Sequence, residues 1–269
     1  MSQINTNLGS LNAQRNLSMT QSSLSTSMQR LSSGVRINSA KDDAAGLAIS
    51  DRMSSQVRGL NQGIRNANDG ISLVQTSEGA LGAVTDMLQR MRELAVQGAN
   101  STNGTDDLAN LNAEYQSLKT EIDRIGTSTK FNGQAILAGD AGAKAFQVGA
   151  NAADTITITT VAATAYTAGI GGLTSNALAS AEITAIDASL KLVSTDRATY
   201  GAAQNTMQFA IQNLQNASEN QSAARGRILD ADFAQETANL SRAQVLQQAG
   251  TAMVAQANQL PQGVLALLR

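Results

Sequence analysis

The sequence contains no cysteine and no histidine among its 269 residues. Disulfides, thiolate and imidazole metal sites, and nucleophiles of the Ser-His or Cys-His type are therefore excluded. Tryptophan is also absent, proline occurs once, and aromatic residues make up only 3% of the chain. So few large side chains favour thin helical seams over a thick globular core. We expect no catalytic residue, no bound metal and no cofactor.

The chain also lacks a charge imbalance and a long apolar run. A net charge of -2 gives no electrostatic reason to expect nucleic acid or acidic lipid as the main partner. No run of 18 apolar residues is present, so no membrane-spanning helix is expected. Residues 1–7 are polar and lack the basic and apolar regions of a cleavable secretory signal.

The stretch 43–97 dominates the pattern. Apolar residues recur every seven positions, at Met53, Leu60, Ala67, Val74, Leu81, Leu88 and Ala95. A seven-residue apolar repeat is typical of helices that pack along a long seam. One helix of this length spans about 80 Å at 1.5 Å per residue, whereas a globule of this size has a radius of gyration of about 18 Å. The sequence therefore predicts a mainly α, rod-like helical bundle.

Shorter segments surround this helix. Residues 1–33 carry a sparse apolar stripe that Gly34 ends, and 34–43 form a connector. The loop 98–104 precedes a second striped helix at 106–125, and so short a loop favours an antiparallel hairpin. Asp42-Asp43 and Asp106-Asp107 stand before helices, where capping is a better explanation than acid–base chemistry.

The periodicity changes after the second helix. Phe131-Asn-Gly133 is a turn signal, and residues 154–160 alternate with β-branched side chains, so we expect strands within 131–160. Residues 161–185 are the most loop-like part of the chain, and a helical pattern returns from Ile186 to about position 230. The Ser/Thr-rich stretch 155–176 could carry O-linked glycans, although its composition is also that of an ordinary loop.

The two ends of the chain resemble each other. Both have thin apolar stripes, polar backs and a mild positive charge, and Pro261 is expected to limit the last helix. Because like charges repel, we expect the ends to pair by apolar contact. One thin seam cannot offset an ordering cost of roughly 1–2 kcal/mol per residue, so we expect both ends to be disordered in the monomer. The expected assembly seam consists of Leu8, Leu11, Leu24, Met28, Leu31, Leu246, Met253 and Leu260.

Several longer motifs resemble one known family. Residues 1–7, 29–34, 38–50, 66–70 and 88–97 resemble the N-terminal core of bacterial flagellin. The turn at 131–133 and residues 147–151, 225–228 and 256–259 also resemble parts of flagellin. The resemblance covers about 1–160 and 186–269 and points to a short form with a minimal variable region.

The resemblance implies an architecture. Residues 1–40 and 232–269 would pair as an inner coiled-coil domain, with the N- and C-termini together, lining the export channel of a filament. Residues 44–160 and 186–230 would form an outer helical rod with a β-hairpin at 131–160. Residues 161–185 would be a short variable surface segment.

The resemblance also implies a function and partners. The chain would be a homo-oligomeric subunit of the extracellular flagellar filament, used for swimming and exported unfolded by the flagellar type III pathway. Its partners would include a secretion chaperone, cap and hook-junction proteins, and the flagellin-sensing Toll-like receptor of animals. The receptor-contact residues by resemblance are Gln89, Arg90, Leu94 and Glu114. On spacing alone, a solvated helix face is the better explanation of Arg90 and Arg92, and the family motif shifts the interpretation toward a receptor contact.

Two alternatives stay open from the sequence. A hook–filament junction protein belongs to the same structural class, and a signalling coiled coil such as a chemoreceptor fragment belongs to another. The signalling coiled coil should be acid-rich and lack strands, unlike this chain. Terminal membrane anchors are disfavoured because the ends have few basic and aromatic residues.

Overall fold

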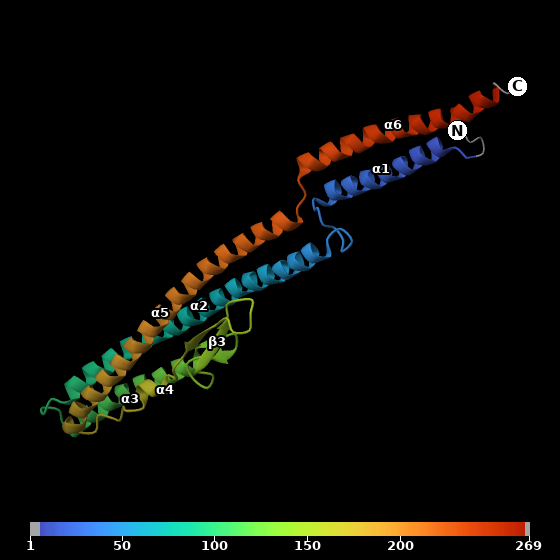
Figure 1. Cartoon of the computed structure of the whole chain (residues 1–269). Helices are drawn as coiled ribbons and strands as arrows, with labels where there is room; N and C mark the ends of the chain where they lie inside the picture. Colours follow the sequence, from blue (N-terminus) through green and yellow to red (C-terminus); the bar gives the residue numbers. More distant parts are fainter. Residues whose placement is uncertain (1–5, 267–269) are drawn as a thin grey trace. The chain divides into compact units, whose positions relative to one another are not determined.

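The computed structural model describes residues 6–266, with side chains through Gln259. Within these described residues, six helices and four short strands follow in the order α1 (Leu8–Ser33), α2 (Ala44–Gly98), α3 (Thr105–Ser128), β1 (Lys130–Phe131), β2 (Gln134–Ala135), β3 (Ala143–Gln147), β4 (Thr155–Thr159), α4 (Thr164–Thr167), α5 (Asn176–Leu229) and α6 (Phe233–Ala266) (Figure 1). The predicted mainly α class is confirmed. At 55 residues, α2 is a single helix about 80 Å long.

The structure divides into two compact units. One comprises Gln56–Glu219, and the other contains the chain on either side of it. The boundaries fall inside α2 and α5, so residues 44–55 and 220–230 group with the terminal helices rather than with the expected outer rod. Whether the units form inner and outer layers of a filament stays a prediction.

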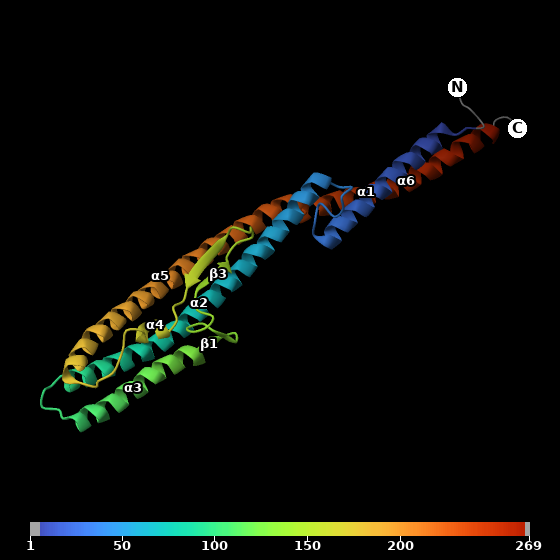
Figure 2. The same ribbon diagram turned by 90° about the horizontal axis from the view of Figure 1, so that it is seen from below.

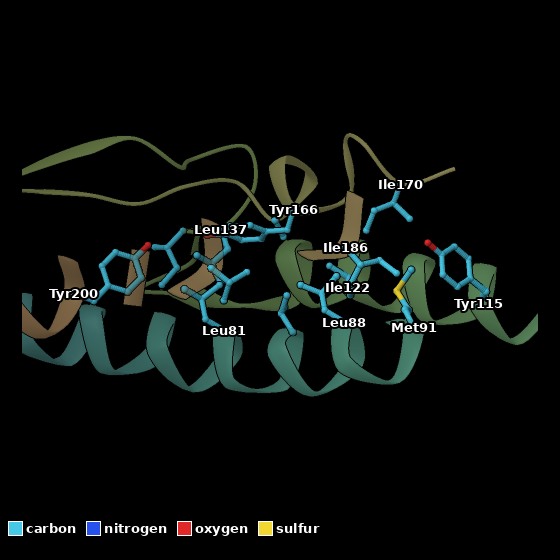
Figure 3. Close-up of a cluster of buried hydrophobic side chains, with 14 of the residues drawn as sticks. Leu81, Leu88, Met91, Tyr115, Ile122, Leu137, Tyr166, Ile170, Ile186 and Tyr200 are labelled. Carbon is cyan, nitrogen blue, oxygen red and sulfur yellow. The ribbon is translucent and has the colours of Figure 1, made fainter. Parts of the chain in front are cut away.

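The core of unit Gln56–Glu219 lies between α2, α3 and α5 (Figure 3). The heptad positions Ala67, Val74, Leu81, Leu88 and Ala95 are each 0% exposed. Tyr115 and Ile122 of α3 and Ile186 and Tyr200 of α5 pack in the same core. The seven-residue repeat therefore marks the inward face of α2, as the sequence predicted.

Polar pairs also join α2 to α5. Arg92 Nε donates to Asp187 at 2.7 Å, and Gln204 Nε2 donates to Glu78 at 3.0 Å. Since the partner's number falls as the α2 number rises, the two helices run antiparallel.

Two hairpins occupy the region where one was expected. β1 and β2 pair through a turn at Asn132 and Gly133, whose φ values of 48° and 80° fit a type I′ turn. β3 and β4 pair separately, with Ala143 opposite Thr159 and Gln147 opposite Thr155. The end of β3 lies close to α2 because Gly63 has no side chain: a Cβ there would lie 2.7 Å from the Val148 carbonyl.

Residues 161–175 contribute side chains to the core, whereas a surface segment was expected at 161–185. Ala163, Tyr166, Ile170 and Leu173 are at most 4% exposed and join the core. Helix α5 also begins at Asn176, ten positions before the predicted start at 186.

Polar contacts hold this segment in place. Tyr166 Oη donates to Asp196 at 2.8 Å, and the Gly171 N–H donates to the buried carboxylate of Glu182 at 3.0 Å. Glu182 also accepts a hydrogen bond from Tyr115 at 2.8 Å. The low charge of residues 161–175 suggested a loop. It is explained instead by burial, because this segment contributes side chains to the core.

The connectors next to α1 and α6 pair with each other. Gly34 ends α1 in the left-handed conformation, with φ 72°. The Arg36 N–H donates to the Leu229 carbonyl at 2.7 Å, and the Ala231 N–H donates to the Gly34 carbonyl at 3.0 Å. Asp43 caps α2 by accepting from the Gly46 N–H at 2.8 Å, as predicted. Asp42 instead closes the turn at 38–42.

Helix α6 continues through Pro261 to Ala266, whereas the sequence suggested that it would end there. A proline lacks the N–H that would bond to the carbonyl four residues earlier, which here belongs to Ala257. The side chain of Asn7, the residue that caps α1, donates to that carbonyl at 2.6 Å. The hydrogen bond that the proline removes is therefore replaced from the neighbouring helix.

Candidate functional site

Helices α1 and α6 lie side by side and antiparallel, as both views show (Figures 1 and 2). Their contacts fix this direction, since Asn7 meets Ala257 at one end and Ser27 meets Glu236 at the other. Buried or half-buried positions recur at alternating spacings of three and four on each helix. They are Ser10, Ala13, Leu17, Thr20, Leu24, Ser27 and Leu31 on α1, and Glu236, Leu240, Ala243, Gln247, Gly250, Val254 and Ala257 on α6.

A polar cluster closes one end of this seam. Glu236 is 7% exposed, and its carboxylate accepts from Ser27 Oγ and from Arg30, each at 3.0 Å. Burial by itself raises the pKa of Glu236, but hydrogen bonds from Arg30, Ser27 and Asn239 outweigh it and hold the pKa below its ordinary value. The cluster therefore contains an ionised, paired carboxylate between the two helices.

Pairing of the ends by apolar contact alone was wrong. The expectation treated both ends as positive, but Glu236 of α6 meets Arg30 of α1. Glu236 is the only acid in 233–266, and it falls in phase with the inward positions of its helix. That phase was the signal in the sequence that could have identified it.

The residues of the expected assembly seam fall into two groups. Leu24 and Leu31 are half-buried between α1 and α6. Leu8, Leu11, Met28, Leu246 and Met253 are instead between 50% and 65% exposed, and Leu260 lies outside the residues whose side chains are described. Met19 and Val245, which sequence reasoning missed, are equally exposed at 56% and 64%. The terminal pair thus turns most of its large apolar side chains away from its own seam.

A groove runs along one side of the pair, with a volume of about 740 Å³. Its walls come from both helices and include Met19, Ser23 and Arg30 of α1 and Asn239, Arg242 and Leu246 of α6. Met253 lies one heptad beyond Leu246 and so shares its face of α6. The groove is lined both by apolar side chains and by side chains that can form hydrogen bonds.

The expected receptor-contact residues divide as well. Gln89 and Arg90 of α2 and Glu114 of α3 are exposed, and Arg90 Nε donates to Glu114 at 2.9 Å. Arg90 also pairs with Glu93 at 2.9 Å. Leu94 is only 1% exposed and belongs to the core, so its side chain does not lie on this surface. It follows Met91 by three positions, which places it on the buried face of α2.

The part of the chain that the structure describes, residues 6–266, contains no group of three acidic, cysteine or histidine side chains that could hold a metal ion. None of the helices in that part is both long and apolar enough to cross a membrane.

Comparisons with known proteins agree with this architecture. Residues 4–141 match the bacterial flagellin N-terminal helical region, and residues 183–268 match the C-terminal helical region. A flagellin of Halalkalibacterium halodurans is 49% identical over 270 residues, covering 99% of both chains. The chain belongs to the bacterial flagellin family. It is a structural subunit of the extracellular flagellar filament.

Two further relatives differ from this flagellin in length. Flagellin A of Vibrio cholerae is 35% identical with 99% of both chains covered, but the alignment spans 375 positions. That relative therefore carries insertions that this 269-residue flagellin lacks. The crystal structure of Bacillus cereus flagellin is 34% identical, with a TM-score of 0.52, and covers 60% of this chain and 94% of that one.

The lowered pKa of Glu236 predicts that the terminal pair of this flagellin is sensitive to acid. Because the pKa is lowered in the folded state, the carboxylate stabilises the pair fully above its unfolded pKa of about 4.3. That contribution is lost as the pH falls through the folded pKa. We expect Glu236→Gln filaments to be less stable than the parent at pH 7, and this difference to close below about pH 4.

Light scattering of filaments against pH measures the effect. Asp187→Asn is the control, because Asp187 is an exposed carboxylate whose pKa Arg92 also lowers, but it lies outside the terminal pair. A difference between parent and Glu236→Gln that did not vary with pH would contradict the role given to this carboxylate.

Proposed function

We propose that this flagellin polymerises by burying the exposed apolar side chains of α1 and α6 against other copies of the chain. The observation that carries the proposal is the exposure of Leu8, Leu11, Met28, Leu246 and Met253 in a single copy. Fully burying one such side chain contributes roughly 1.5–3 kcal/mol. Five of them in every copy supply a driving force that a lone subunit leaves unused.

The same burial explains when the terminal helices fold. The internal seam contains Leu17, Leu24 and Leu31 from α1, but it faces mostly small or polar residues of α6. Ordering the backbone costs roughly 1–2 kcal/mol per residue. We infer that the pair is disordered in dilute monomer and becomes ordered as neighbouring copies cover its outer faces.

Growth of a filament requires contacts that do not close on themselves. Leu8, Leu11 and Met28 are exposed but do not line the groove beside Met19 and Leu246, so the pair offers apolar groups outside the groove as well. When one surface of a copy packs on a different surface of the next, the contact is heterologous and assembly continues as an open helix.

Two properties of the chain suit export in an unfolded state. The chain has no cysteine, so no disulfide has to be reduced before it unfolds. Terminal segments that stay disordered until assembly suit passage through a narrow type III channel. We propose that a secretion chaperone covers the C-terminal segment before export, and that cap and hook-junction proteins receive the subunit outside.

We also propose that the monomer is recognised by the flagellin-sensing Toll-like receptor through Gln89, Arg90 and Glu114. All three are exposed, and Glu114 holds the Arg90 guanidinium from the adjacent helix. Leu94, expected by resemblance to touch the receptor, is buried and would support this surface from below.

Met253→Glu tests assembly. The substitution removes an exposed apolar group that polymerisation would bury and leaves a charge in its place. A loss of 1.5–3 kcal/mol of burial corresponds to a rise of about 10- to 100-fold in the critical concentration for polymerisation. Sedimentation of seeded filaments measures it.

Met253→Leu is the matched control and should assemble close to the parental concentration, because it conserves volume and polarity. Polymerisation of Met253→Glu at the parental critical concentration would refute the assembly surface.

Arg90→Ala tests receptor recognition. Removing the guanidinium takes away a charged contact, and we expect the monomer concentration for half-maximal signalling in a reporter cell to rise at least about tenfold. Arg124→Ala is the control, because Arg124 is another exposed arginine with a partner three residues away, Glu121. Equal signalling by Arg90→Ala and the parent would remove the proposed contact.

A further inference from the structure

The apolar residues of the α1–α6 seam leave the alignment of the two helices ambiguous. Leu17, Leu24 and Leu31 repeat every seven residues on α1. The positions they can face on α6 are small at the same interval, at Ala243, Gly250 and Ala257. Leu17 lies over Gly250, where an added Cβ would be 3.1 Å from Leu17 Cδ1. The match is thus a series of large residues over small ones.

A slide of seven residues preserves this match. Leu24 would then lie over Gly250, Leu31 over Ala243 and Leu17 over Ala257. Each leucine would then meet a small residue, and a heptad repeat keeps the same faces together after such a slide. In the observed alignment only Leu17 and Leu24 do so, because Leu31 lies opposite Glu236, at the same sum of residue numbers as Leu17 and Gly250. Apolar packing therefore does not favour the observed alignment.

Polar contacts at the two ends of the seam do distinguish them. At one end, Glu236 accepts from Ser27 and Arg30. At the other, Asn7 donates to the Ala257 carbonyl, which has no helical partner because residue 261 is proline. A seven-residue slide carries Glu236 beyond the end of α1 at Ser33 and takes Asn7 away from the Ala257 carbonyl, whose helical hydrogen bond Pro261 removes.

We propose that these two end contacts, Glu236 with Ser27 and Arg30 and Asn7 with the Ala257 carbonyl, set the register of α1 against α6. A buried polar or ionic pair adds little net stability, but leaving one partner buried without the other is costly. The best-attested use of such a pair is to fix the register of two helices. Ser27, Arg30, Glu236 and Asn7 are positioning residues for assembly. The inference rests on the proposed function, since a helical filament needs the same register in every copy.

The connectors offer a competing explanation. The Gly34 carbonyl accepts from Ala231, and this bond also ties the end of α1 to the start of α6. If the connectors alone set the register, removing the end contacts would leave it unchanged. The two explanations therefore predict different results for the same variants.

Cysteine cross-linking reads the register directly, because the natural chain has no cysteine. Thr20→Cys with Gln247→Cys reports the observed register, since their numbers have the same sum as those of Leu17 and Gly250. Thr20→Cys with Val254→Cys reports the alignment slid by seven residues. All three positions are half-buried on the inward faces. Each double-cysteine chain is copolymerised as a minority with the cysteine-free parent, and the filaments are then oxidised. On a denaturing gel, a chain that carries an intrachain disulfide migrates as a monomer.

The test compares three backgrounds. In the parent, we expect the observed-register link to exceed the slid link at least about tenfold. In Glu236→Leu combined with Asn7→Leu, the slid link should rise until the ratio falls by about tenfold or more. Leu24→Ala is the control: it weakens the apolar seam, so both links should fall together with the ratio unchanged.

The charge-exchanged variant carries Arg30→Glu with Glu236→Arg, and recovery of the parental ratio of links in it would support the proposal. The proposal would also be supported if filaments incorporated the charge-exchanged chain and the Leu24→Ala chain but excluded the Glu236→Leu/Asn7→Leu chain. A parental ratio in Glu236→Leu/Asn7→Leu would overturn the register proposal while leaving the filament function intact. Failure of the parent chain itself to form filaments would instead count against the proposed function.

Discussion

The shortage of apolar area between α1 and α6 is the constraint on which the behaviour of this flagellin depends. Their seam contains serine, threonine, alanine and glycine between a few leucines, and its most buried side chains include Ser27 and Glu236. The large side chains Leu246 and Met253 point outward instead. We infer that a helix pair built in this way cannot offset its own ordering cost, so that its stability depends on the surfaces that cover it.

Unit Gln56–Glu219, by contrast, buries its large apolar side chains within a single copy of the chain. It places Leu81, Leu88 and Tyr115 in a core that is complete within one chain, and it draws residues 161–175 into that core through Glu182. A subunit with one self-sufficient unit and one conditional unit can exist as a soluble monomer and still gain free energy by polymerising. The absence of cysteine leaves nothing covalent to hold the conditional unit in place before assembly.

Periodicity predicted the parts of the fold that depend on one helix at a time. The heptads of α2 and the stripe of α3 are buried as expected, and the same phase also places Leu94 beside Met91 in the core. The resemblance had assigned Leu94 to a surface contact. Glu236 and residues 161–175 were misjudged for another reason: their partners lie far away in the sequence. Local charge and composition carry no information about Ser27, Arg30 or Tyr115 as neighbours.

Hydrogen exchange on the same chain before and after polymerisation tests this account most directly. The account predicts that amides of α1 and α6 exchange rapidly in dilute monomer and slowly in filaments, while amides near Leu88 in α2 are protected in both states. Slow exchange throughout α1 and α6 in the dilute monomer would show that the terminal pair is stable by itself, and would contradict the central claim.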